Sequence, residues 1–402
     1  MERARTLVLT GAATVFSGDL AAPVLPGVDT VACADGVVTA VGTAADLRAE
    51  LDTADVHVDL RGGTLAPGLI DSHGHVTFGD YSPRQRAVDY LASYLQGGIT
   101  TTISAGEVHV PGRPRDRAGV KALAVAAHAS YRTYRPGGMR VRAGALLIEP
   151  TLREPDYREV ADAGVHLAKF GFGAFTSAHE GVDHVRWAQR AGLTVMCHAG
   201  GASAAGGASI GGPELLALRP DVCGHANGGP TALPEDAVAA LFDETGMALQ
   251  VVQAGNLRAA LRIIDMARER DALHRVVIGS DTPSGFGVMP LGVIKTVVEL
   301  SALGGLPPER SWALATGGPG RVWALPEGVL RVGAPADLLC LGAPAGSQAD
   351  TASEAISIGD MPAITAVVTD GAVRAAPGRN TPKPAVPVTI TGHHPAAAPD
   401  HA

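Results

Sequence analysis

The chain has 402 residues, 46% of them hydrophobic and 18% charged, and a net charge of -8 with histidine counted as neutral. This composition excludes a wholly disordered chain, and the lack of basic excess argues against nucleic acid or an anionic membrane as partner, which leaves a small molecule. Four widely spaced cysteines without a CxxC pair fit a reducing cytoplasm. No stretch reaches the roughly 20 apolar residues of a membrane span.

Both ends of the chain are predicted to be β-rich. Short strand-like runs bounded by Gly, Asp and Pro occupy residues 6–16, 29–42, 56–60, 329–342 and 363–375. We therefore expect residues 1–63 and 325–379 to form one composite β-sandwich domain. The segment 380–402, rich in Pro and Ala, is predicted to be a disordered tail.

Between these ends, apolar β-rich runs alternate with segments that have apolar residues at helical spacing. The eight runs are TLAPGLID, GITTTISAG, MRVRAGALLIE, GVHLAKFG, LTVMCHAGG, DVCGHANGG, MALQVVQAG and RVVIGSD. Eight βα units predict an α/β fold, a (β/α)8 TIM-like barrel over residues 64–324. In such barrels the catalytic groups lie at the C-terminal ends of the strands.

Six potential metal ligands occur at the ends of these runs. They are His73 and His75 on the first strand, Lys169 on the fourth, His198 on the fifth, His225 on the sixth and Asp281 on the eighth. Several nitrogen ligands with a carboxylate suit zinc, iron or manganese better than calcium or magnesium. Burial beside metal ions lowers the pKa of a lysine, and a neutral amine can react with carbon dioxide to form a carbamate, a bridging carboxylate. Two metal ions then become possible.

Each of these residues also has an ordinary structural explanation. A single histidine at a strand end is more often a hydrogen-bonded structural residue, Asp281 could cap a helix, and Lys169 could pair with a neighbouring carboxylate. Six such residues at five strand ends, about one or two βα units apart, favour a metal site.

These residues resemble the amidohydrolase superfamily. The segment PGLIDSHGH (67–75), the lysine of the fourth strand, the two later histidines and Asp281 are similar to its dinuclear pattern. Within the superfamily, loops such as ISAGEVHVPGRPRD (103–116), GHANGGPTAL (224–233) and SDTPSGFGVMPLG (280–292) resemble those of the enamidase group, which opens unsaturated cyclic amides.

The resemblance implies a role for each ligand. One divalent metal ion would be held by His73, His75 and Asp281 and the other by His198 and His225, with a carbamate on Lys169 and a hydroxide bridging them. The metals would be zinc, with iron or manganese as alternatives. The hydroxide would attack the amide carbon, and Asp281 would act as general acid/base to open the C–N bond of a small cyclic enamide, lactam or imide. The resemblance also suggests a homotetramer.

Five further residues are candidates for substrate contact: Tyr81, Arg84, His109, Arg113 and Asn227. Either arginine could bind a substrate carboxylate through its planar fork. The alternatives are another C–N hydrolase of this scaffold, dihydropyrimidinase-like or deaminase-like, and a catalytically silent scaffold protein. The lysine argues against most deaminases, and the complete ligand set argues against a silent scaffold.

Overall fold

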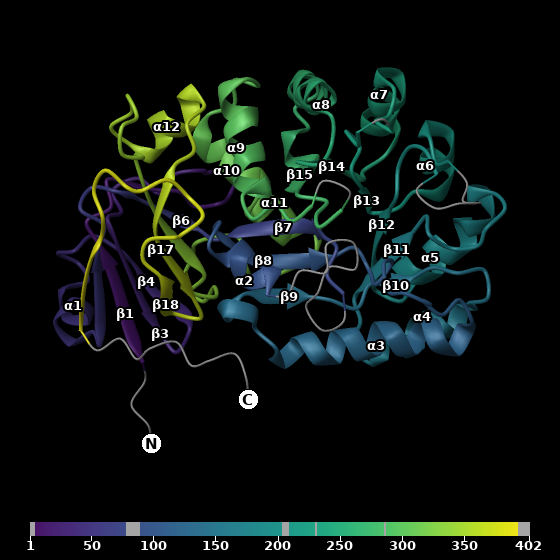
Figure 1. Cartoon of the computed structure of the whole chain (residues 1–402), viewed down its shortest axis with the longest axis horizontal. Helices are drawn as coiled ribbons and strands as arrows, with labels where there is room; N and C mark the ends of the chain where they lie inside the picture. Colours follow the sequence, from purple (N-terminus) through teal and green to yellow (C-terminus); the bar gives the residue numbers. More distant parts are fainter. Residues whose placement is uncertain (1–4, 78–88, 203–208, 230, 285–286, 393–402) are drawn as a thin grey trace.

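The computed structural model describes residues 5–77, 89–202, 209–229, 231–284 and 287–392. Figure 1 shows a β-rich region that contains both ends of the chain, next to a larger region in which helices surround parallel strands. Within the described ranges, none of the helices combines the length and apolarity needed to cross a bilayer.

The ends of the chain form two five-stranded sheets. Their strands are β1 (Thr6–Thr10), β2 (Thr14–Val15), β3 (Thr30–Ala34), β4 (Val37–Gly42), β5 (Val56–Asp59), β6 (Thr64–Pro67), β16 (Leu338–Gly342), β17 (Ala363–Thr369), β18 (Ala372–Ala375) and β19 (Thr389–Gly392). One sheet has the order β19-β5-β1-β3-β4 and the other β18-β17-β16-β6-β2. A single cluster of buried apolar side chains includes Leu7 and Val58 of the first sheet and Leu338 and Val368 of the second. The two ends of the chain therefore share one core.

The prediction of a disordered tail from residue 380 is wrong as far as Gly392. Strand β19 pairs antiparallel with β5, and the Ala345 amide donates to the Lys383 carbonyl. Val388 and Ile390 pack against the shared core of the two sheets. The overall Pro and Ala content of the segment concealed this short β-branched run. Residues 393–402 lie outside the described residues.

The run TLAPGLID, predicted as one strand, forms two. Strand β6 belongs to a terminal sheet, whereas β7 (Leu69–Gly74) pairs in parallel with β8 (Ile99–Ser104). A Cβ atom on Gly68 would lie 2.1 Å from Thr100 Oγ1, so the chain can pass this point only as glycine. The change from one sheet to the other falls at Gly68, not after residue 63.

Nine short parallel strands are described in the larger region. After β7 and β8 come β9 (Arg140–Arg142), β10 (Leu146–Leu147), β11 (Leu167–Phe170), β12 (Thr194–Cys197), β13 (Val222–Cys223), β14 (Ala248–Val252) and β15 (Val276–Gly279). They form sheets of order β7-β8-β9 and β10-β11-β12-β13-β14-β15. The predicted third strand is thus split into β9 and β10, while Gly74 at the end of β7 bridges in parallel to Thr282 after β15. This succession of neighbours is the one that a (β/α)8 barrel requires.

Helices cover the outside of these strands (Figure 1). They are α2 (Tyr90–Leu95), α3 (Arg117–Thr133), α4 (Glu154–Asp162), α5 (Val182–Arg190), α6 (Gly212–Leu218), α7 (Glu235–Glu244), α8 (Leu257–Glu269), α9 (Gly292–Ala302), α10 (Pro308–Leu314) and α11 (Gly317–Val322), while α1 (Arg48–Thr53) and α12 (Ala352–Ile358) belong to the terminal segments. Helix α8 illustrates why these segments form helices that pack against the strands. Asn256 caps its first turn, and one face carries a buried apolar stripe of Ala260, Ile263, Ile264 and Ala267.

An ion cluster joins the two regions. Arg140 of β9 lies 2.7 Å from Asp337, immediately before β16, and 3.4 Å from the buried Glu327. It also pairs with Asp370, in the turn between β17 and β18. Glu327 and Asp337 are almost fully buried, and Glu327 also pairs with Arg142 of β9. The two arginines therefore compensate these buried charges and fix β9 against the terminal sheet.

Candidate metal centre

The first group of ligands lies where β7 and β15 end. His75 Nε2 is 2.7 Å from Asp281 Oδ1, and His73 Nε2 is 3.4 Å from the same oxygen. Two backbone hydrogen bonds tie the segments together: Asp281 N donates to His73 O, and His75 N to Thr282 O. One ligand atom from each of the three side chains lies within 4.8 Å of the others, which is close enough for a single cation.

The second group lies at the ends of β12 and β13. His225 Nε2 is 2.9 Å from His198 Nδ1. Two nitrogens bound to one tetrahedral zinc ion are separated by about 3.3 Å, so little movement would admit a metal ion. His198 Nε2 lies 2.7 Å from the Gly201 carbonyl. A carbonyl can only accept, so Nε2 carries the proton and Nδ1 presents its lone pair to the site. The His73 and His225 rings lie 5.5 Å apart, which places the two groups next to each other.

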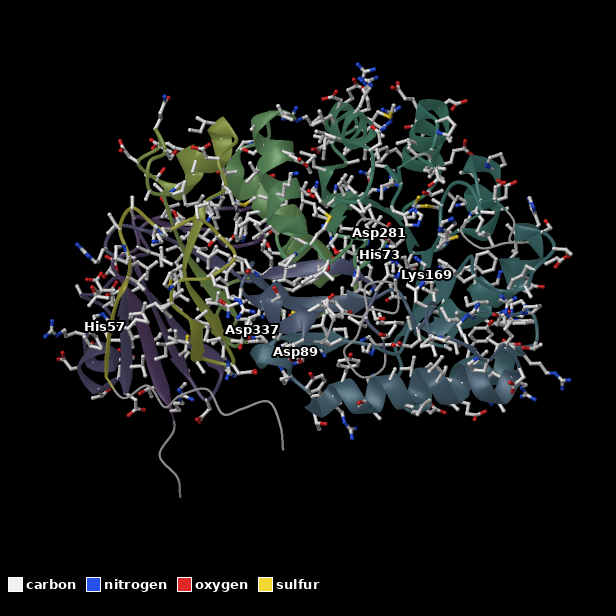
Figure 2. All side chains as sticks on the ribbon, in the orientation of Figure 1. His57, His73, Asp89, Lys169, Asp281 and Asp337 are labelled. Carbon is white, nitrogen blue, oxygen red and sulfur yellow. The ribbon has the colours of Figure 1, made fainter. Side chains whose placement is uncertain are left out.

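Lys169 of β11 lies beside these histidines. Figure 2 shows its label near those of His73 and Asp281, and its side chain is 1% exposed. Its Nζ atom has no hydrogen-bond partner among the described residues, and no described carboxylate forms an ion pair with it. Burial lowers the pKa of Lys169 to about 8. Its described contact is with the face of the Phe172 ring, at 5.8 Å from the centroid. A buried amine with this pKa and no described hydrogen-bond or ion-pair partner fits a site of carbamate formation better than a structural ion pair.

The electrostatics of the site favour neutral imidazoles and an ionised aspartate. Burial lowers the pKa of His198 to about 4 and that of His225 to about 3, and it holds the pKa of His73 well below its ordinary value. Burial opposes ionisation of Asp281, but His73 and the hydrogen bond from His75 outweigh it and lower the pKa of this carboxyl. Neutral nitrogen donors with one carboxylate fit a borderline divalent cation such as zinc.

Arg113, expected to contact a substrate carboxylate, has protein partners in the structure. Its Nη1 donates to Glu149 Oε1 at 3.0 Å, and its Nη2 to the Phe172 carbonyl at 3.0 Å. Glu149 is fully buried and also accepts from the Ala174 amide. The arginine therefore ties the loop after β8 to the loop after β11, and its role as a carboxylate clamp stays a prediction that this geometry does not favour.

The other residues expected to contact the substrate differ in where they lie relative to the metal ligands. Tyr81 and Arg84 lie outside the described residues. The centroid of the His109 ring lies 4.8 Å from that of His75, with the two rings tilted by 57°, so His109 lies at the site. Asn227 donates from its amide nitrogen to the carbonyls of Val252 and Asn256. Its amide oxygen accepts from the Val252 amide at 2.8 Å. Backbone groups therefore use both ends of this buried side chain, and the role of Asn227 in substrate contact stays a prediction that this geometry does not favour.

Sequence reasoning missed two buried residues that hold the ligands. Asp71 accepts hydrogen bonds from the amides of His73 and Ser280 and from the Ser280 hydroxyl. Gln250 of β14 contacts His73 and the backbone of His225. In both cases the signal was a polar residue inside an otherwise apolar strand, GLIDSHG and MALQVV.

The family profile of the amidohydrolases, described as the Amidohydrolase family, matches residues 64–374. The chain belongs to the amidohydrolase family. Enamidase of Eubacterium barkeri is 39% identical over 369 residues, which cover 92% of this chain and 95% of that protein. The crystal structure of enamidase matches with a TM-score of 0.92 and 38% identity, over 96% of this chain and 100% of the other. An imidazolonepropionase of Salinispora arenicola is 28% identical over 333 residues, 72% of this chain and 81% of that protein. The resemblance seen in the motifs is thus confirmed.

Proposed function

We propose that this chain is a metal-dependent hydrolase that opens the C–N bond of a small cyclic amide. The carrying observation is the convergence at the strand ends of four histidines, an aspartate and a buried lysine whose Nζ has no described hydrogen-bond partner. Support for the substrate class comes from the similarity to enamidase along almost the whole of both chains.

In this proposal the ligand atoms divide into two sets. One divalent ion is held by His73, His75 and Asp281 and a second by His198 Nδ1 and His225 Nε2, with a carbamate on Lys169 between them. The nitrogen and carboxylate donors make zinc the first choice and iron or manganese the alternatives. The orphaned Lys169 Nζ is the observation that best supports the carbamate.

Divalent ions at such a site supply a nucleophile at neutral pH and polarise the amide carbonyl. Asp281 is the group we assign to proton transfer. Its side chain is 21% exposed, against 1% for His73 and 8% for His75, so it reaches furthest toward a substrate. Its lowered pKa keeps it ionised, which is the form that can accept a proton, and in this proposal it passes that proton to the leaving nitrogen. If the ring is an enamide, the released enamine can tautomerise to an imine and hydrolyse to an aldehyde and ammonia.

The finer architecture belongs to the same proposal. We expect the sheets β7-β8-β9 and β10 to β15 to close into one barrel. Gly74, at the end of β7, bridges to Thr282, after β15, and β9 is followed along the chain by β10 at the other junction. We expect the two terminal sheets to pack as a sandwich around their shared core, with the domains changing at Gly68 and near residue 325. A cytoplasmic location stays a prediction, which the four free buried cysteines support. A homotetramer also stays a prediction, and mass photometry can test it.

The proposal is tested on purified, metal-analysed protein against a panel of cyclic amides. The panel contains an enamide, a saturated lactam and an imide of equal ring size, together with a ring that carries an exocyclic amine, and ring opening and ammonia release are recorded separately. We expect about two metal ions per chain, ring opening of at least one member, and loss of activity with a chelator that added metal reverses. Full activity of metal-free protein would contradict the proposal. Release of ammonia from an exocyclic amine without ring opening would favour the deaminase alternative.

A further inference from the structure

Gln250 is a fully buried glutamine that connects three strands. From β14 its Oε1 lies 2.5 Å from His73 Nδ1, on β7, and 3.2 Å from the backbone nitrogen of His225, after β13. Its Nε2 lies 2.9 Å from the carbonyl oxygen of Ser72 and 2.8 Å from the Ser72 hydroxyl. One side chain thus contacts a ligand residue from each half of the candidate metal centre.

Two backbone groups of fixed polarity determine how this amide is oriented. The Ser72 carbonyl can only accept, so the amide nitrogen of Gln250 must face it. The His225 backbone N–H can only donate, so the amide oxygen must face His225. The Ser72 hydroxyl already donates to the Ile278 carbonyl at 2.7 Å and is free to accept from Gln250. Every contact agrees with a single orientation.

That orientation determines the proton on His73. Facing an amide oxygen at 2.5 Å, Nδ1 must carry the hydrogen of the neutral ring. Nε2 is then the nitrogen with the lone pair, and it is Nε2 that lies 3.4 Å from Asp281. A ring with the opposite tautomer would present a hydrogen to a metal ion.

We propose that Gln250 is a positioning residue that selects the metal-binding tautomer of His73 and fixes the spacing between the two metal sites. The inference rests on the proposed metal-dependent function and adds to it a residue that touches neither metal nor substrate. The second part of the role concerns His225, whose φ of 36° is a left-handed conformation that a non-glycine residue rarely adopts. The hydrogen bond from its amide to Gln250 Oε1 holds it there.

The chain offers a matched control, a second glutamine three residues further along the chain. Gln253, immediately after the same strand, accepts a hydrogen bond from Thr296 of α9 at 2.9 Å and forms a hydrogen bond with Glu299 of that helix. Among the described residues, no hydrogen bond joins its side chain to a proposed metal ligand. The test variants are Gln250→Met, which keeps the length of the side chain but removes its hydrogen bonds, Gln250→Glu, which keeps the acceptor, and Gln253→Met. Metal affinity is measured by competition with a chromophoric chelator, and ligand geometry by the visible absorption of the Co(II)-loaded protein.

We expect Gln250→Met to bind metal about 10- to 100-fold more weakly, the usual effect of removing the partner of a metal-bound histidine, and to change the Co(II) spectrum. kcat should fall with KM nearly unchanged, since no substrate contact is lost. Gln250→Glu should restore affinity to within about threefold of the wild type, because one oxygen still accepts from His73 and the other, protonated in this buried position, donates to the Ser72 carbonyl as the amide does. Gln253→Met should leave affinity and spectrum unchanged.

Wild-type affinity and an unchanged spectrum in Gln250→Met would overturn the inference. If that variant does not fold, Gln250→Glu decides: retained affinity supports the role of the acceptor, and a loss of tenfold or more refutes it. Failure of the proposed function looks different, because the wild-type protein itself would then bind no metal or open no ring.

Discussion

Replacing Lys169 by alanine tests the centre of the proposal most directly. The lysine side chain is 1% exposed, and its Nζ has no partner among the described residues. At its pKa of about 8, the ratio of neutral to charged amine at pH 7.5 is about 1 to 3, against roughly 1 to 1000 for an ordinary lysine. The structure therefore supplies a neutral amine for reaction with carbon dioxide under ordinary conditions.

The size of the effect follows from the number of ligands. Apparent zinc-binding free energies of about 10 to 16 kcal/mol in four-ligand sites correspond to roughly 2.5 to 4 kcal/mol for each ligand, or about 100- to 1000-fold in affinity. Loss of the bridge also leaves two nearby cations with their repulsion less compensated. We therefore expect Lys169→Ala to lose at least one metal ion and nearly all activity.

The assay combines metal analysis with carbon-13 NMR of protein exposed to labelled bicarbonate. The wild type should show one carbamate resonance that is absent from Lys169→Ala, and short carboxylic acids should partly restore metal binding to the variant. Lys295→Ala, which removes a half-exposed lysine of α9, is the control and should behave as the wild type. Two metal ions per chain and full turnover in Lys169→Ala would refute the reasoning.

Four further predictions address other parts of the molecule. Asp281→Asn should keep its fold but lose about two to four orders of magnitude in kcat, as expected for loss of a general acid/base; near wild-type turnover would show that the proton moves through another group. Arg140→Met should lower the free energy of unfolding by about 3 to 5 kcal/mol, because it removes the cation that lies 2.7 Å from the buried Asp337, and urea denaturation that finds under 1 kcal/mol would contradict this. Metal-free protein should lose stability as the pH falls from about 6.5 to about 4, because folded His198 and His225, with pKa values of about 4 and 3, bind fewer protons there than the unfolded chain. A free energy of unfolding that does not vary across this range would exclude such linkage. Arg113→Ala should raise KM for carboxylated and neutral cyclic amides alike, since its terminal nitrogens bind protein groups; a selective rise for the carboxylated substrate would restore the clamp role.

The ligand-bearing strand ends could be predicted because their signals are local. In PGLIDSHGH, alternation along a strand is enough to point His73 and His75 the same way, and βα spacing is enough to bring His198 and His225 to the same end of the sheet. The same reasoning gave eight strand-forming runs in the correct order. These predictions required no information about contacts between residues that are distant in sequence.

What could not be predicted depends on contacts between distant parts of the chain. The strand break at Gly68 exists because Thr100 occupies the space of a side chain there. Arg113 binds Glu149, which lies in the loop after β10 and is distant in sequence. Strand β19 forms because β5 offers it an edge, although its own composition favours disorder. In each case the local sequence is compatible with both outcomes, and the partner decides.

The buried polar residues beneath the ligands explain how a site assembled from five strand ends can have a definite geometry. Asp71 links the backbone of His73 to Ser280, and so joins β7 to the segment that carries the aspartate ligand. Gln250 links His73 to the backbone of His225, and so joins β7 to the second group of histidines. A shift of β7 relative to β14, or to the segments that follow β13 and β15, must therefore break a buried hydrogen bond, at about 1 to 3 kcal/mol each. Reactions that need two metal ions and a proton carrier at fixed separations lose much of their rate when one group moves by about 1 Å. The polar layer below the ligands is thus as much a requirement of the proposed chemistry as the ligands themselves.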